Sequence, residues 1–126
     1  MSLYKTSIEK EDKTDKKKTR HFSSKQEKQV AKQLNGKVTP NSGATPFAPG
    51  DVKTDKFLIE CKTRTDTSKS ISIKKEWIEK IRKEALFAGK EYEALIFNFG
   101  PGEENYAIIN MSLFQTLLDY IDSEDV

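Results

Sequence analysis

The sequence predicts an α/β protein with a mixed central sheet flanked by helices. Two runs of strand-forming residues, 57–63 and 94–99, are separated by the segment 74–88, whose apolar residues recur at helical spacing. The full order of expected elements is one helix, three strands, a helix, two strands and a final helix, which is typical of layered α/β domains. With 126 residues, the chain has the length of one domain with a modest core.

The N-terminal part is expected to change character near residue 20. Residues 1–20 are mostly Lys, Glu, Asp and Thr with few apolar side chains, so a basic, disordered tail is predicted there, followed by one domain over 21–126. A helix is expected from Ser24, because Ser24 and Glu27 have the spacing of a capping box. Asn35-Gly36 should end this helix.

The later elements follow from local patterns in the same way. Short strands are expected at 37–39 and from Asp51, on either side of the Pro- and Gly-rich loop 40–50. The remaining expected elements are a strand over 57–63, a polar connection over 64–70, a helix from Lys74 to Ala88 that Gly89 ends, strands over 94–99 and 106–109, and a helix that Ser112 caps and that runs to about Asp122.

Composition argues against several classes of protein. No apolar run approaches the roughly 20 residues of a membrane span, so no membrane partner is expected. The single cysteine, Cys61, excludes an internal disulfide and suits a reducing cytoplasm, which would be that of the host for a phage-encoded protein. Neither Cys61 nor His21, the only histidine, has the partners that a zinc site needs. The six glycines form no phosphate-cradling loop, so no nucleotide cofactor is expected.

Charge is distributed unevenly along the chain. All 22 Lys and Arg residues lie within 1–90, whereas 91–126 contains eight acidic residues and no basic one. This polarity favours an anionic partner, with nucleic acid as the first candidate. The equal alternative is a Lys-rich surface that only keeps a small protein in solution.

The candidate site centres on Asp51 and the run Glu60-Cys61-Lys62. Side chains alternate along a strand, so Glu60 and Lys62 should share one face while Cys61 points to the core. Two carboxylates and an ammonium on a half-buried strand are costly without a purpose, and Mg2+ held by Asp51 and Glu60 provides one. The backbone carbonyl of Cys61 is a further candidate ligand. Lys62 would then orient a metal-bound water or offset the charge that develops on a phosphodiester.

Ordinary structural roles are the alternative for each of these residues. Asp51 could only cap a turn after Gly50, and Glu60 and Lys62 could form an ion pair on a solvated sheet face. For Glu27, a capping role and a catalytic role are equally open. Trp77 lies on the apolar stripe of its helix and is expected in the core rather than as a platform for stacked bases.

These motifs resemble the PD-(D/E)XK nuclease superfamily, and within it the archaeal and phage-type Holliday junction resolvases. The similarity covers about residues 22–99 and includes Gly50-Asp51, Glu60-x-Lys62, the early helical Glu27 and the loop residues Ser42-Gly43. The chain departs from the family pattern at Pro49, which stands one position too early. The resemblance implies a restriction-endonuclease-like αβββαβ core, to which this chain would add a C-terminal strand and helix.

The resemblance also implies a function. Asp51, Glu60 and Glu27 would bind Mg2+, for which Mn2+ should substitute, and Lys62 would be catalytic. The chain would be a metal-dependent DNA endonuclease, most specifically a Holliday junction resolvase that acts as a homodimer on branched DNA. The alternatives are another PD-(D/E)XK repair or restriction-like endonuclease, and a non-catalytic DNA-binding protein.

Further residues are expected to contact DNA or a second subunit. Ser42 is implied at the active-site loop, and the basic residues expected to bind nucleic acid are Arg20, Lys25, Arg64, Lys69, Lys74 and Lys75. The C-terminal helix has more apolar residues than one narrow stripe requires, which favours a dimer interface. The alternative is that these residues cover the last strands of their own sheet.

Overall fold

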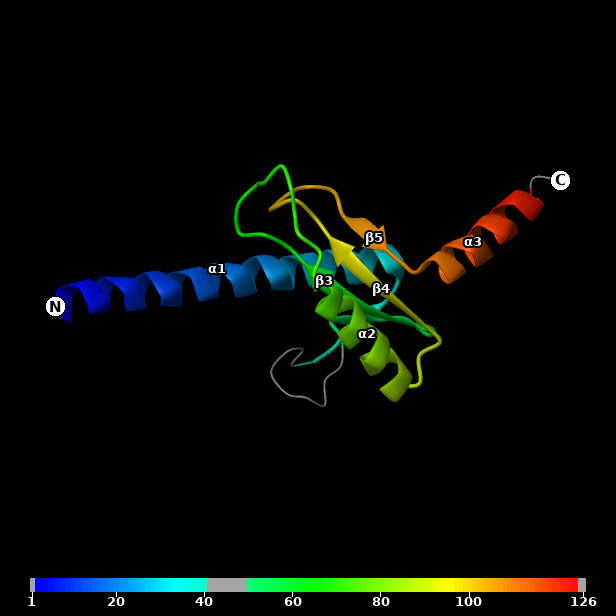
Figure 1. Ribbon diagram of the computed structural model, residues 1–126, viewed down its shortest axis with the longest axis horizontal. Coiled ribbons are helices and arrows are strands. Elements are labelled where there is room, and N and C mark those ends of the chain that lie inside the picture. The colour runs from blue at the N-terminus through cyan, green and yellow to red at the C-terminus, as the bar shows by residue number, and fades with distance from the viewer. Residues whose placement is uncertain (1, 41–49, 125–126) are drawn as a thin grey trace.

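The computed structural model describes residues 2–40 and 50–124 (Figure 1). Within them the chain is an α/β protein with a five-stranded mixed sheet and three helices. In chain order the elements are α1 (Ser2–Leu34), β1 (Lys37–Val38), β2 (Val52–Lys53), β3 (Phe57–Lys62), α2 (Lys75–Phe87), β4 (Tyr92–Phe97), β5 (Tyr106–Ile108) and α3 (Met111–Glu124). The predicted order of elements is therefore confirmed.

The strands lie side by side in the order β1-β2-β3-β4-β5. All neighbouring pairs are antiparallel except β3 and β4, which are parallel and are joined through α2. A parallel pair needs such a crossover, because the chain must return to the starting edge of the sheet. The carboxyl ends of β3 and β4 consequently lie at the same edge, with Lys62 opposite Phe97 in the register.

One helix packs on each face of the sheet. Val30 and Ala31 of α1 pack with the buried apolar residues of one face, which are Val52, Ile59, Cys61, Ala94 and Ile96. On the other face, Ile81 and Ala85 of α2 pack on Leu58. The alternation along β3 therefore directs Cys61 towards α1, and Glu60 and Lys62 towards the side of α2, as the sequence predicts.

Helix α1 is much longer than expected. It begins at Ser2 and passes residue 20 without a break, whereas a basic, disordered tail was predicted for 1–20. The physical reason is that residues 2–34 contain neither Gly nor Pro, so nothing stops the helix once its C-terminal half packs on the sheet. Ser24 consequently lies in the middle of α1 and caps nothing. Figure 1 shows the N-terminal half of α1 extending away from the sheet.

Some helix ends agree with the sequence prediction, whereas one strand boundary and one helix cap differ from it. Asn35, with φ of 54°, ends α1, and Gly89, with φ of 70°, follows the end of α2, both as expected. Strand β4 begins two residues earlier than the predicted strand 94–99. Asn110, and not Ser112, caps α3, because its Oδ1 accepts the N–H of Leu113 at 2.8 Å.

The last helix contacts the rest of the molecule only slightly. Leu113 is the buried residue of α3, and Figure 1 shows the helix projecting from the sheet rather than covering it. Apart from Leu113, the large apolar residues of α3 are exposed and do not cover the last strands of their own sheet. None of the helices in the described part of the chain is both long and apolar enough to cross a membrane.

Candidate active site

Asp51 is held in the plane of the sheet by three hydrogen bonds. Its N–H donates to the carbonyl of Ile59 at 2.8 Å, and its own carbonyl accepts the N–H of Thr39 at 2.9 Å. Its side-chain Oδ2 accepts the N–H of Cys61 at 2.7 Å. The side chain of Asp51 thus accepts a backbone N–H of β3 just beyond the end of the region in which β2 pairs with β3.

Gly50 explains why a glycine precedes the acid in this motif. Its φ of 67° favours glycine, and a Cβ at this position would lie 2.7 Å from the side chain of Leu58. The N–H of Gly50 donates to Glu84 Oε2 of α2 at 2.9 Å, and Glu84 pairs with Lys80 at 3.7 Å. Helix α2 therefore anchors the backbone that presents Asp51.

Asp51 interacts with two further carboxyl groups, one from β3 and one from α1. Glu60 approaches Asp51 from β3, and Glu27 approaches it from α1. Burial raises the pKa of Glu60 from its ordinary 4.5 to about 8; the charge of Asp51 and a hydrogen bond with it add to this rise, while Lys80 and Lys62 oppose it. Burial also raises the pKa of Glu27 to about 7, again with contributions from the charge of Asp51 and a hydrogen bond with it. A cluster of this kind is unfavourable when fully ionised, unless a cation offsets the repulsion.

Cys61 contributes backbone rather than its thiol. The N–H and C=O of a strand residue point to the same side of the strand, so the carbonyl of Cys61 is directed to the side on which Asp51 accepts its N–H. The thiol belongs to the core, and burial, followed by the charges of Asp51, Glu27 and Glu60, raises its pKa well above the usual range. This thiol is therefore no candidate nucleophile.

All four predicted catalytic residues line one pocket of about 580 Å3. Its walls come from α1, the edge of β3, the loop after β3 and the first turn of α2, and its lining residues are Thr19, Ser23, Glu27, Asp51, Glu60, Cys61, Lys62, Thr63, Arg64, Ile71, Ser72, Lys74 and Trp77. A larger pocket of about 740 Å3, near Lys37 and Lys53, includes none of the predicted site residues. The structure thus brings together residues 27, 51, 60 and 62 from three separate segments.

Two neighbours of Lys62 were not predicted as part of the site. Trp77 was expected in the core, but it is only partly buried and lines the pocket, with Lys62 Nζ 4.5 Å from the centre of its ring. Gln26 is 3% exposed, and its Nε2 donates to the carbonyl of Lys62 at 2.8 Å. The sequence indicates Gln26 only indirectly: this polar residue directly precedes Glu27 in the part of α1 that packs on the sheet.

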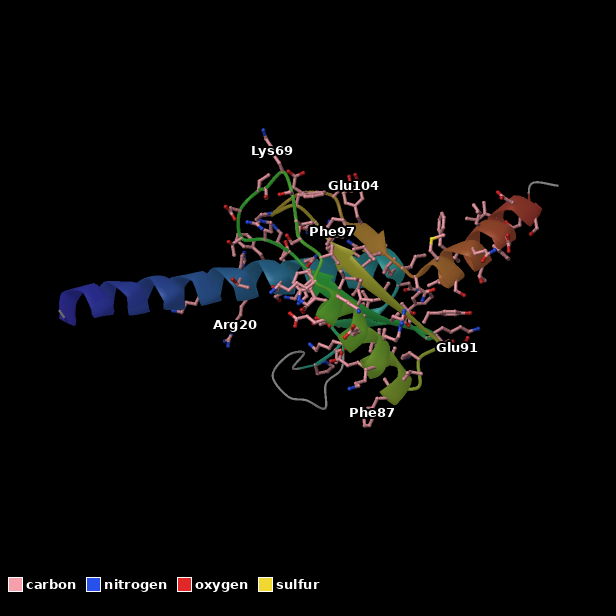
Figure 2. The ribbon with its side chains drawn as sticks, in the orientation of Figure 1. Arg20, Lys69, Phe87, Glu91, Phe97 and Glu104 are labelled. Atoms are coloured by element: carbon pink, nitrogen blue, oxygen red, sulfur yellow. The ribbon has the colours of Figure 1, made fainter. Side chains whose placement is uncertain are left out.

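The residues predicted to bind nucleic acid are distributed over a wider surface. Arg64 and Lys74 line the pocket, whereas Arg20, Lys25, Lys69 and Lys75 lie outside its lining. Figure 2 shows Lys69 at the tip of the loop between β3 and α2, and Arg20 on the part of α1 that leaves the sheet. Ser42 lies outside the described residues.

The donor set suits Mg2+ without enclosing it. Among the residues that the structure describes, no three His, Cys, Asp or Glu side chains form a ready-made metal cage. Mg2+ commonly binds through one or two carboxylates and keeps several waters, so Asp51, Glu60 and the carbonyl of Cys61 provide the chemistry that it requires. Glu27 shares a hydrogen bond with Asp51 and adds negative charge beside this donor set.

Comparisons with known proteins do not assign the chain to a family. No protein-family model matches it, and neither a curated protein sequence nor a solved structure matches it. The functional conclusion therefore depends on the residues and on their geometry.

Proposed function

We propose that the protein is a Mg2+-dependent DNA endonuclease of the PD-(D/E)XK type. The observation that carries this proposal is the convergence of Asp51, Glu60 and Lys62 in one pocket, where burial and mutual repulsion raise the pKa of a carboxyl group. A cation beside these carboxylates would relieve their repulsion. An anionic substrate would then interact with Lys62 and with Arg64 and Lys74 of the pocket wall.

Each of these pocket residues would have a distinct role. Asp51 and Glu60 would hold the metal ion, and the carbonyl of Cys61 would complete the protein's share of its ligands. Mg2+, when bound, would supply a water of lowered pKa and a positive charge for the hydrolysis of a phosphodiester. Lys62 places an ammonium where negative charge develops on the phosphate oxygens. Arg64 and Lys74, at the wall of the same pocket, would hold the flanking phosphates.

The arrangement of elements supports the same proposal. The order α1, β1–β3, α2 and β4 is compatible with the restriction-endonuclease-like core that the resemblance implies, and β5 with α3 would be an addition to it. We extend the proposal to a junction-resolving enzyme that acts as a homodimer on branched DNA. Its support is the resemblance together with the exposed apolar residues of α3.

The decisive experiment is a cleavage assay with matched variants. Purified protein is incubated in Mg2+, in Mn2+ and in EDTA with a four-way junction, linear duplex, a flap and single-stranded DNA. Asp51→Asn and Glu60→Gln should each lower the cleavage rate more than about 100-fold, because an amide cannot replace the charge that holds the metal ion. Glu91→Gln, an exposed change before β4 and outside the pocket, should cut at the wild-type rate.

The other outcomes separate the alternatives. Near wild-type turnover by either Asp51→Asn or Glu60→Gln would overturn the assignment of the site. Tight DNA binding with no cleavage in any divalent metal would instead favour a non-catalytic DNA-binding protein. Equal cutting of linear duplex and four-way junction would leave another endonuclease of the same superfamily as the better assignment.

A further inference from the structure

We propose that Trp77 is a positioning residue that holds the ammonium of Lys62 at the carboxylate pocket. This inference rests on the function proposed above, since it assigns a role to Lys62 in that site. Lys62 Nζ lies 4.5 Å from the centre of the indole ring, within the range of a cation–π interaction. Both residues line the same pocket as Asp51 and Glu60.

The backbone of Lys62 is already fixed, which leaves its side chain as the part to be ordered. Its carbonyl accepts Gln26 Nε2 at 2.8 Å and the N–H of Asn98 at 3.3 Å. Beyond the backbone, a lysine side chain has four rotatable carbon bonds and loses substantial entropy when one position is imposed on it. An aromatic face next to the ammonium favours one position of the side chain.

The position of Trp77 on α2 is unusual for a residue that would serve only the core. The buried residues of α2 are Ile81 and Ala85, which pack on Leu58. Trp77 lies one turn before Ile81, beyond this cluster, and is only partly buried. The helix thus continues its apolar stripe past the core and into the pocket wall.

A second ammonium approaches the same ring. Lys74, the residue that precedes α2, has its Nζ 5.8 Å from the ring centre. Lys74 Nζ also lies 4.0 Å from the carboxylate of Glu76, so an anion beside it already offsets part of its charge. Of the two ammonium groups, that of Lys62 lies closer to the ring of Trp77, which makes Lys62 the group that Trp77 positions.

Substitutions at Trp77 distinguish positioning from packing. Trp77→Leu keeps apolar volume but removes the aromatic face, and it should lower kcat about tenfold while KM for DNA changes little. Trp77→Phe keeps an aromatic face and should restore most of the loss. Phe87→Leu, at the exposed far end of the same helix (Figure 2), is the control and should leave kcat unchanged. A Trp77→Leu protein with a lowered melting temperature but wild-type kcat would overturn the proposal.

Fluorescence tests the pairing without reference to activity. Trp77 is the sole tryptophan, so the emission comes from this ring and reports on its surroundings. Lys62→Met should shift or intensify the emission, whereas Lys83→Met, an exposed change on α2 outside the pocket lining, should not. Identical emission from wild type and Lys62→Met would overturn the positioning role. If the emission changes but the wild-type protein cuts no DNA, the pairing stands and the proposed nuclease function fails.

Discussion

For Glu27, the structure excludes the helix-capping role that the sequence left open. Ser24 and Glu27 lie in the middle of α1, so neither can cap the start of the helix. Glu27 instead lies beside Asp51, and its pKa is raised to about 7. A carboxylate in this position is unfavourable for folding and is better explained by a role in the site.

We predict that Glu27→Gln lowers cleavage about 10- to 100-fold in Mg2+, which is typical for a residue that supports metal ligands. The melting temperature should stay the same or rise, because the change removes a carboxylate next to Asp51. Both quantities are measured on one preparation, with Glu91→Gln as the control. Wild-type turnover with a lowered melting temperature would mean that Glu27 has a structural role only.

The raised pKa values also predict how stability depends on pH in the absence of metal. The pKa values of Glu27 and Glu60 are about 7 and about 8 in the folded protein, against an ordinary value of 4.5. The folded state therefore binds more protons than the unfolded state between these limits, and the free energy of unfolding should fall as pH rises from about 4.5 to about 8.

Urea unfolding in EDTA at several pH values between 4.5 and 8 measures this dependence. The variant Glu27→Gln/Glu60→Gln should show a flatter profile over that window, since it lacks both raised groups. Added Mg2+ should stabilise the wild-type protein most at the upper end, where the carboxylates are ionised. A stability that rises with pH in wild type relative to the variant would contradict the raised pKa values.

At the scale of elements, α3 has an apolar stripe without a partner in the described structure. Met111, Phe114, Leu118 and Ile121 follow one another at intervals of three, four and three residues, and all are exposed. This spacing is that of a coiled-coil seam, and the buried residue Leu113 lies next to it. A second copy of α3 is therefore the partner that we expect in the proposed homodimer.

We predict that Leu118→Glu weakens the dimer about 30-fold, as expected when a central apolar contact is replaced by a charge. Thr116→Glu places the same charge on the opposite side of α3 and should leave the dimer intact. Sedimentation across a concentration series measures both variants. A wild-type protein that stays monomeric even with junction DNA would refute the homodimer.

The N-terminal half of α1 supports a second prediction at this scale. Residues 1–18 carry six lysines and four acidic residues, and the pocket lining begins at Thr19. Removal of 1–18 should weaken binding to every form of DNA and leave the chemical step unchanged. The slope of log affinity against log salt should become shallower by about 1 to 2 units, because each lost phosphate contact contributes about 0.9. An unchanged salt slope would show that this part of α1 does not contact DNA.

In the whole molecule, part of the acidic C-terminal segment lies beside a basic loop. The acidic residues Glu103 and Glu104 lie in the connection after β4, at the same edge of the sheet as the loop after β3, where Ser68 N–H donates to the carbonyl of Phe99 at 2.8 Å. Figure 2 shows Glu104 and Lys69 at this end of the molecule. Acidic residues next to a basic loop would repel a phosphate backbone that approached from this side.

The sequence by itself determined the features that depend on neighbouring residues. Alternation along 57–62 predicts that Glu60 and Lys62 share a face while Cys61 enters the core, and the helix ends at Asn35 and Gly89 follow from residues that accept a positive φ. The approach of Asp51 to this strand was also predicted as a hypothesis. Charged side chains on a half-buried strand are costly unless a shared partner, such as a metal ion, offsets them.

Only the tertiary structure decided the features that depend on contacts between distant segments. Whether Glu27 caps a helix or faces Asp51 depends on where α1 begins, and a capping pattern cannot show that the helix continues past it. Whether Trp77 enters the core or the pocket depends on where α2 crosses the sheet, since the same apolar stripe serves both. Local sequence patterns specify which face of a strand or helix a residue occupies and where a helix ends. Which of these faces come into contact is set by packing across the sheet.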